Sequence, residues 1–244
     1  MVQSPRAVLS QLSVPESIAM TIGRSLMIFD VEGTLVESAG LTLRSWQETL
    51  QSFGFEFPLT TLQRHSGHDP HDVLHELLPG PHVTRALGRI IEMQGQRYRE
   101  KYLPQVTAFP DVRTLFERVK RARRLIALAT SSSADEFDHY LSLLNVGDLV
   151  DAVACGDDVQ RDKPDSALIE VALLRAGKVA PEEAVMIGDT PYDAIAAKHA
   201  RVRAIGMLSG GFSRAELEAS GCAAVYRDPS DLLAHHDETV RLRA

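Results

Sequence analysis

Residues 26–37 read LMIFDVEGTLVE, and this stretch decides the fold. Four apolar residues are followed at once by a carboxylate, Asp30, and then by a turn that contains Gly33. A short apolar run bounded by Asp and Gly is typical of a strand that is buried on both faces of a parallel sheet. Ligands of such sheets bind beyond the carboxyl ends of the strands. The stretch therefore predicts a buried strand with a functional carboxylate at its end.

The rest of the chain alternates short apolar runs with amphipathic helical patterns, which is typical of an α/β domain with a parallel sheet. The expected strands are Leu26–Phe29, Leu125–Ala129, Ala152–Cys155, Ala184–Ile187, Val202–Met207 and Ala223–Tyr226. The expected helices between them are Val112–Ala122, Ala134–Leu144, Ser166–Ala176, Tyr192–His199 and Ser213–Ser220. We therefore predict a Rossmann-like α/β core.

Residues 38–109 interrupt this alternation with helical periodicity and no convincing strand. Asp69 and Pro70 are suited to the N-cap and the first position of one helix, which Pro79-Gly80 would end. A later helical pattern runs to Pro104. Apolar residues spaced three and four apart predict an earlier helix that Gly54 would end, and they are Leu43, Trp46, Leu50 and Phe53.

We therefore divide the chain into three parts. Residues 1–24 form an N-terminal extension, residues 25–37 and 110–244 form the α/β core, and residues 38–109 form an all-helical insert. An all-helical insert between the first strand and the rest of such a core is typical of a lid.

Composition limits the kinds of partner. The 244 residues carry a net charge of -7 and a pI near 5.7, so no broad positive field attracts nucleic acid. No apolar run is long enough to span a bilayer, which predicts no membrane partner. The 2 cysteines are too few for a disulfide framework, and the first 24 residues make a poor signal peptide. We therefore expect a cytoplasmic protein that is a monomer or a weak homodimer.

Polar clusters follow the other expected strands or precede a helix, and the sheet could bring them to the same edge as Asp30. Thr130-Ser131-Ser132 follows the second strand, and Lys163-Pro164 stands before a helix. The fourth strand is followed by Gly188-Asp189-Thr190-Pro191-Tyr192-Asp193.

This set of side chains suits phosphoryl transfer. A carboxylate such as Asp30 meets charge repulsion when it attacks a phosphate monoester, and a divalent cation together with Lys163 would offset that repulsion. Asp30 and Asp189 offer the hard oxygen ligands that Mg²⁺ prefers. The expected substrate is therefore a small phosphorylated metabolite, and the expected cofactor is Mg²⁺.

The remaining groups suit substrate binding and proton transfer. Thr130 and the backbone N–H groups near Gly33 and Ser131 can donate hydrogen bonds to the transferred phosphoryl oxygens. Glu32 lies two residues beyond Asp30, where it could protonate the leaving alkoxide and later deprotonate the attacking water.

The DVEGTL stretch, Thr130, Lys163 and the GDTPYD stretch resemble, in order and spacing, the four motifs of the haloacid dehalogenase superfamily. The helical insert resembles that superfamily's C1 cap. Stretches such as YLPQVTAFPDVRTLFERVK and LIALATSSS are similar to the phosphoglycolate phosphatase and β-phosphoglucomutase branch. The resemblance implies that Asp30 is the nucleophile, that Thr130 binds a phosphoryl oxygen and that Lys163 neutralises charge.

The resemblance also implies a metal site. The implied Mg²⁺ ligands are Asp30, Asp189 and the backbone carbonyl of Glu32, and Asp193 would support the metal or the lysine. Glu32 departs from the family pattern, which usually has Asp at this position. Enolase-phosphatase-like members also carry Glu there, which keeps a catalytic role open.

Part of the stretch Arg64–His71 aligns with the cap loop that contacts substrate in this branch, which implies such a role for Arg64, His65 or His68. The same region invites a metal site, because histidines stand at positions 65, 68, 71 and 75. A solvated helix face explains them better, since the reaction requires no second metal.

Several rival functions share parts of this pattern. A phosphomutase has the same four motifs, and a non-catalytic phosphometabolite-binding protein would agree with the unusual Glu32. A dehalogenase lacks an acid two positions after the nucleophile, so Glu32 argues against one. A phosphonatase uses a cap lysine, and the insert has only Lys101, near its end.

Overall fold

The computed structural model describes residues 25–78, 80 and 86–235. Its core is a sheet of six parallel strands in the order β3-β2-β1-β4-β5-β6. The expected Rossmann-like α/β fold is confirmed, and each expected strand is present with ends within one residue. The strands are β1 (Leu26–Phe29), β2 (Leu125–Ala129), β3 (Ala152–Ala154), β4 (Ala184–Gly188), β5 (Arg203–Met207) and β6 (Cys222–Tyr226).

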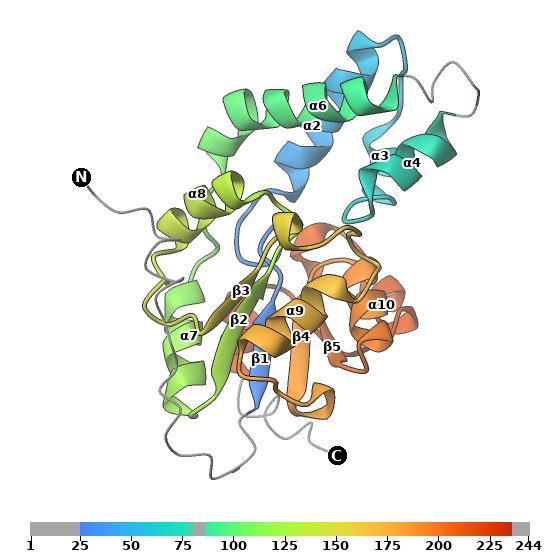
Figure 1. Ribbon diagram of the computed structural model, residues 1–244. Helices are drawn as coiled ribbons and strands as arrows, with labels where there is room; N and C mark the ends of the chain where they lie inside the picture. Colours follow the sequence, from blue (N-terminus) through green and yellow to red (C-terminus); the bar gives the residue numbers. More distant parts are fainter. Residues whose placement is uncertain (1–24, 79, 81–85, 236–244) are drawn as a thin grey trace.

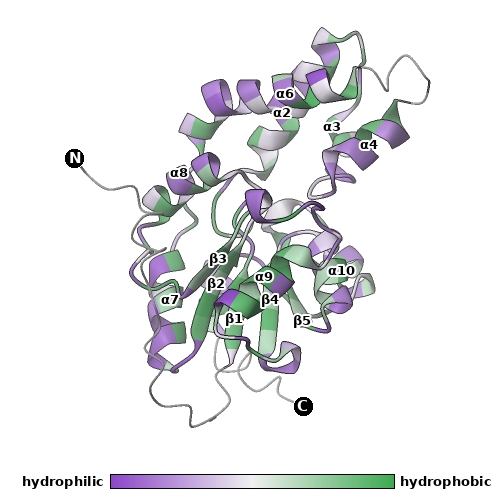
Figure 2. Ribbon diagram, in the orientation of Figure 1, coloured by the Kyte–Doolittle hydropathy of each residue, from purple (hydrophilic) through white to green (hydrophobic). Residues whose placement is uncertain are grey.

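Strand β1 lies in the middle of the sheet and is buried along its whole length. Its side chains alternate between two hydrophobic layers, as the geometry of a strand requires. Met27 and Phe29 pack on one face of the sheet, whereas Leu26 and Ile28 pack on the other. Figure 2 shows the apolar strands between helices whose outer faces are hydrophilic.

Helices cover both faces of the sheet (Figure 1). Five of them were expected, with ends within one residue. The sixth, α12, was not expected, although Asp228 and Pro229 are an ordinary N-cap and first residue and Asp228 accepts a hydrogen bond from the Asp231 N–H at 2.8 Å. The six are α7 (Val112–Arg121), α8 (Ala134–Leu144), α9 (Ala167–Arg175), α10 (Pro191–His199), α11 (Arg214–Ala219) and α12 (Pro229–Ala234).

Residues 39–105, hereafter the helical segment, stand apart from the sheet beyond the carboxyl ends of its strands (Figure 1). They have a small apolar core of their own, in which Leu50, Leu74 and Ile90 are buried. The elements are α2 (Ala39–Ser52), α3 (Leu59–Gln63), α4 (Pro70–Leu77), α6 (Leu87–Arg97), a π-helix (Tyr98–Tyr102) and a 3₁₀-helix (Leu103–Gln105).

The helical segment agrees with most of the sequence expectation. Asp69 is the N-cap of α4 and accepts a hydrogen bond from the His71 N–H at 2.8 Å, and Gly54 follows α2 with a φ of +85°. The short helix α3 was not expected, and the pattern that runs to Pro104 is divided into an α-helix, a π-helix and a 3₁₀-helix. The N-terminal extension and Pro79 lie outside the described residues.

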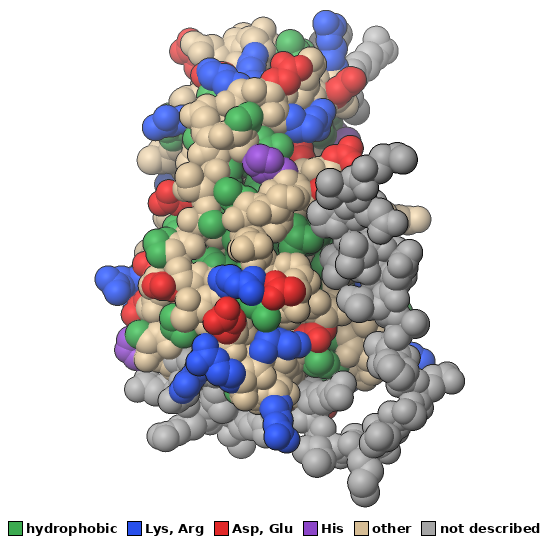
Figure 3. Space-filling view, turned by 90° about the vertical axis from the view of Figure 1, so that its left-hand side faces the viewer, with side chains coloured by type: hydrophobic (Ala, Val, Ile, Leu, Met, Phe, Trp, Pro, Cys, Tyr) green, Lys and Arg blue, Asp and Glu red, His purple; other side chains and the backbone are tan. Residues whose placement is uncertain are grey.

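Figure 3 shows one face of the molecule, on which side chains of both charge signs are interspersed. Exposed ion pairs among the described residues include Arg113–Asp148 and Lys101–Glu48. None of the described helices is long and apolar enough to cross a membrane.

Candidate active site

Asp30 directly follows β1 and is the first residue of the site along the chain. Its backbone N–H donates to the carbonyl of Ile187 at 2.9 Å, which extends the pairing between β1 and β4 by one residue. Its side chain is only 5% exposed. The Thr34 hydroxyl lies 3.1 Å from Asp30 Oδ2 and 3.1 Å from Asp189 Oδ1, so one hydroxyl links the two carboxylates.

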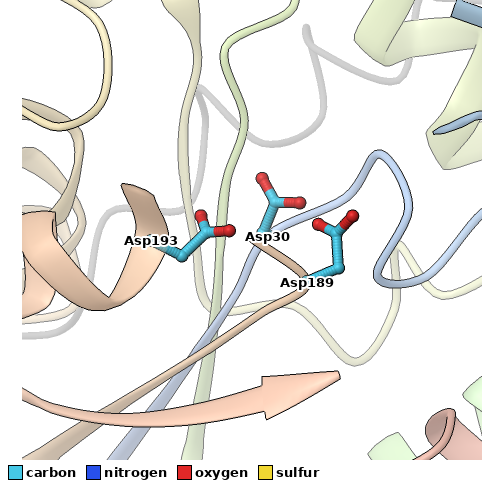
Figure 4. A group of neighbouring side chains, drawn as sticks. All are labelled: Asp30, Asp189 and Asp193. Carbon is cyan, nitrogen blue, oxygen red and sulfur yellow. The ribbon is translucent and has the colours of Figure 1, made fainter. Parts of the chain in front are cut away.

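Two further carboxylates face the same space as Asp30 (Figure 4). Asp189 directly follows β4, and Asp193 lies in the first turn of α10. Oxygen atoms of all three side chains lie within 4.8 Å of one another. The position of Asp193 is fixed by a capping box, because its Oδ2 accepts from the Thr190 N–H at 3.0 Å and from the Thr190 hydroxyl at 2.7 Å.

Lys163 supplies the positive charge of this cluster. Its side chain is buried, and its Nζ forms ion pairs with Asp30 and, at 2.8 Å, with Asp193. Burial opposes the charge of the ammonium group, but the carboxylates of Asp193 and Asp30 outweigh this effect and raise the pKa of Lys163 well above its ordinary value. The lysine is therefore a permanent cation between two carboxylates.

The cluster has too much negative charge for one lysine. Burial raises the pKa of Asp30 well above its ordinary value, and the charges of Asp193 and Asp189 add to this effect while Lys163 opposes it. Burial and the charge of Asp193 raise the pKa of Asp189 to about 7. A second cation would stabilise the ionised form of these buried, crowded carboxylates. Their hard oxygens are the ligands that Mg²⁺ prefers. The residues present therefore fit a divalent cation.

Gly33 allows the close approach of Asp189 to the turn after β1. Its φ is +76°, and a β-carbon at this position would overlap the Asp189 carboxyl group. The Gly33 N–H donates within the turn, to the Val36 carbonyl at 2.9 Å and the Ser38 hydroxyl at 3.1 Å. The expected contact between Gly33 and phosphate would therefore require this turn to change.

Glu32 lies next to the hydroxyl cluster that follows β2. The Thr130 hydroxyl donates to both of its carboxylate oxygens, at 2.9 and 2.8 Å, and the Ser132 hydroxyl donates to Oε1. The Ser131 hydroxyl instead donates to Asp162. The site thus has two parts. One is a cluster of three aspartates and a lysine, and the other is the Glu32 carboxylate, which accepts hydrogen bonds from hydroxyl groups.

These groups and residues of the helical segment line a cavity of about 250 Å³. Asp30, Glu32 and Lys163 line it from the core. The helical segment contributes Thr42, Trp46, Ser66, Gly67, His68, Pro70, Gln94, Gly95 and Tyr98. The cavity therefore lies between the sheet and the helical segment, with Asp30 on its wall.

A family model for haloacid dehalogenase-like hydrolases matches residues 27–207, which include every motif residue described above. The chain belongs to this family. It is 28% identical to the pyrophosphatase PpaX of Bacillus velezensis, over 74% of this chain and 82% of that protein. It is 27% identical to a phosphorylated carbohydrates phosphatase of Thermotoga maritima, over 85% of this chain and 95% of that protein.

Solved structures have the same fold. A hydrolase from Pseudomonas syringae superposes with a TM-score of 0.79 at 30% identity, over 88% of this chain and 99% of that chain. The sequence resemblance to the family is therefore confirmed. The curated relatives include a phosphoglycolate phosphatase, and a solved structure described as a putative β-phosphoglucomutase has the same fold.

Of the three cap-loop residues expected at the substrate, Arg64, His65 and His68, only His68 is among the described residues that line the cavity. His68 lines it and stacks on Tyr192, with ring centroids 4.6 Å apart, and its buried Nδ1 has no hydrogen-bond partner. Arg64 is exposed and is not among the described residues that line the cavity, although its carbonyl accepts from the Tyr192 hydroxyl at 3.2 Å.

The sequence reasoning missed several wall residues, among them Glu136, Tyr98 and Tyr140. These three line the cavity, and the two tyrosine hydroxyls lie 2.8 Å apart. Trp46, which the apolar spacing places in the first helix of the insert, packs in the core of the helical segment and also lines the cavity. The helical patterns predicted the helices in these regions but not that a cavity would face them.

Proposed function

We propose that the chain is a phosphatase that hydrolyses a small phosphorylated metabolite through an aspartyl-phosphate at Asp30. The observation that carries the proposal is the buried ion-pair cluster, in which Lys163 contacts Asp30 and Asp193 on the wall of a cavity. The names of the two curated relatives, a pyrophosphatase and a phosphorylated carbohydrates phosphatase, support the reaction class.

The proposed reaction has two steps. A carboxylate oxygen of Asp30 bonds to phosphorus while the bond from phosphorus to the ester oxygen breaks, and Glu32 donates a proton to the departing alkoxide. In the second step, Glu32 removes a proton from water, whose oxygen bonds to phosphorus as the bond to Asp30 breaks. The products are inorganic phosphate, the free alcohol and the original enzyme.

The other polar groups would bind the transferred phosphoryl group. Lys163 offsets the charge of the nucleophile and the phosphate. Thr130 and the backbone near Ser131 would donate to the phosphoryl oxygens, for which the Thr130 hydroxyl must turn from Glu32. Such donors act strongly in a site that excludes bulk water.

Mg²⁺ would be held by Asp30, Asp189 and the Glu32 backbone carbonyl, with Asp193 fixing Lys163 beside them. When bound, the ion would supply positive charge at the phosphoryl oxygens. The crowded carboxylates and their raised pKa values support this assignment.

We assign residues 38–109 as the cap over a catalytic core formed by residues 25–37 and 110–244. His68 would contact the substrate, since its buried Nδ1 has no partner at the cavity wall. Arg64 would contact the substrate only if the loop that carries it turns toward the cavity.

The test is phosphate release from p-nitrophenyl phosphate and from a panel of phosphorylated metabolites, with Mg²⁺ present. Asp30→Asn removes the nucleophile at nearly constant shape and should lower kcat by at least about 10³-fold. Asp148→Asn makes the same change on an exposed side chain and should retain activity. No hydrolysis by the wild type, or near-normal hydrolysis by Asp30→Asn, would refute the proposal.

A further inference from the structure

The charged side chains on the cavity wall are mostly acidic. Among the described residues, the only lysine or arginine that lines the cavity is Lys163, which is already paired with Asp30 and Asp193. The carboxylates on the wall are Asp30, Glu32, Glu136, Asp162, Asp189 and Asp193. Lys163 and a divalent cation can serve only the one phosphoryl group that is transferred.

Glu136 extends the negative wall away from the reaction centre. It lies in the first turn of α8, directly after the hydroxyl cluster, and its side chain is only 15% exposed. Burial raises its pKa, and the charge of Glu32 adds to this effect. Its nearest cation, Arg99, lies 3.4 Å away with its own side chain half exposed, and Arg99 is not among the lining residues.

The rest of this part of the wall is neutral and suited to hydroxyl groups. Trp46, Tyr98 and Tyr140 present aromatic side chains, and Thr42 and Gln94 present neutral hydrogen-bonding groups. Aromatic faces pack against the C–H groups of a sugar or polyol, while amides, hydroxyls and a carboxylate bind its O–H groups.

We propose that the leaving group is an uncharged, polyhydroxylated alcohol of the sugar or polyol class, and that Glu136 excludes esters that carry a second anion. The inference rests on the proposed phosphatase function and narrows its substrate. A carboxylate or a second phosphate on the leaving group would face Glu32 and Glu136 in a partly desolvated cavity, with no described cation to pair with it.

A consequence concerns the rival phosphomutase. A mutase of this kind must hold a bisphosphorylated intermediate, whose second phosphate needs a cationic partner of its own. The described wall offers no lysine or arginine for it besides the paired Lys163, so the same inference favours hydrolysis over phosphate transfer between two hydroxyls.

The experiment compares kcat/KM within pairs of esters that differ in one group. Sorbitol 6-phosphate is compared with 6-phosphogluconate, and glycerol 1-phosphate with 3-phosphoglycerate, each with Mg²⁺. The wild type should prefer the uncharged member of each pair by at least about tenfold. Glu136→Gln should reduce this preference, because it removes the anion and frees Arg99, and Glu136→Lys should reverse it.

Asp135→Asn is the matched control, since Asp135 lies in the same turn of α8 but is exposed. It should leave the preference unchanged. A wild-type preference for the carboxylate esters, or an unchanged preference in folded Glu136→Gln, would overturn the inference. So would a tenfold preference for glucosamine 6-phosphate over glucose 6-phosphate.

The rate on p-nitrophenyl phosphate separates this failure from failure of the proposed function. Hydrolysis of that ester with the wrong metabolite preference would overturn the substrate inference alone. No hydrolysis of any ester would overturn the phosphatase function and the inference together.

Discussion

Glu32 is the residue whose chemistry the structure clarifies most. Its carboxylate receives hydrogen bonds from the Thr130 and Ser132 hydroxyls on the cavity wall, so its position is fixed before a substrate enters. A fixed carboxylate beside the proposed nucleophile is well suited to carry a proton to the leaving group and later from water.

Glu32→Gln should therefore separate esters by their leaving group. The amide keeps the size of the side chain but cannot release a proton, so hydrolysis of an alkyl phosphate should fall by about 10²–10⁴-fold. An aryl phosphate expels a stable phenolate and should show a burst of phenol followed by slow turnover. Stopped-flow absorbance at the phenolate band measures both phases.

Glu37→Gln is the control for this variant, because Glu37 follows the same turn but is exposed. It should show wild-type rates on both kinds of ester. Wild-type rates and no burst in Glu32→Gln would show that Glu32 is not the proton carrier.

At the residue scale, the sequence predicted the cluster of Asp30, Lys163, Asp189 and Asp193 well. Each follows an apolar strand, precedes a helix or lies in the first turn of one, and parallel strands bring such positions to one edge of the sheet. Glu136 could not be predicted in the same way. Its place at the cavity depends on how α8 packs near the helical segment, and an acidic residue in the first turn of a helix is ordinary.

The helical segment contacts the core close to the residues of the site. Gly67 has a φ of +83°, and a β-carbon there would lie 2.8 Å from the Thr190 side chain. Thr190 caps α10 and holds Asp193 through two hydrogen bonds. Gln63 adds a contact to the Gly210 carbonyl at 2.5 Å. A substitution at Gly67 should therefore displace the Thr190 side chain and, through it, Asp193 at the reaction centre.

Gly67→Ala and Gly54→Ala form a matched pair that tests this contact. Both glycines have a positive φ, so each substitution should cost about 1–2 kcal/mol of folding free energy. Only Gly67→Ala introduces a clash, because nothing lies within 4 Å of a β-carbon at Gly54. We expect kcat/KM to fall about 10–10²-fold in Gly67→Ala and to stay near the wild-type value in Gly54→Ala.

Urea unfolding measures the stability of both variants, and phosphate release measures their activity. Equal losses of activity in the two variants would show that the contact between Gly67 and Thr190 does not position the site.

At the element scale, the sequence predicted the strand ends of the core, and the ends of all its helices except α12, to within one residue because Gly, Asp and Pro mark most of them. The helical segment was less predictable. The division of its last helix at Arg97 into a π-helix depends on tertiary contacts, among them the buried pair Tyr98–Tyr140, that span 42 residues of sequence.

For the whole molecule, the buried carboxylates predict that a divalent cation stabilises the fold. Mg²⁺ at about 100 times its dissociation constant should add about 2.7 kcal/mol to the free energy of unfolding. In a protein of this size, that corresponds to a rise in Tm of about 5–10 °C. Asp189→Asn should lose most of this rise, whereas the exposed control Asp148→Asn should keep it.

Differential scanning calorimetry with and without Mg²⁺ measures this effect independently of activity. An unchanged wild-type Tm at saturating Mg²⁺, or an equal rise in Asp189→Asn, would contradict the proposed metal site.

At the same scale, alternating strand and helix patterns predicted the fold class, and an all-helical insert after the first strand predicted a separate helical segment. The patterns could not show the negative wall of the cavity. Glu32, Asp162 and Glu136 belong to different loops and helices, and only the folded chain brings them to one cavity.

The central claim is that Asp30 accepts the phosphoryl group. The direct measurement is acid quenching of Glu32→Gln during turnover of an aryl phosphate, followed by peptide mass spectrometry. The account predicts one added phosphoryl group on Asp30, which disappears in the double variant with Asp30→Asn. Release of the phenol in a burst with no phosphorylated peptide, or with the phosphoryl group on another residue, would contradict it.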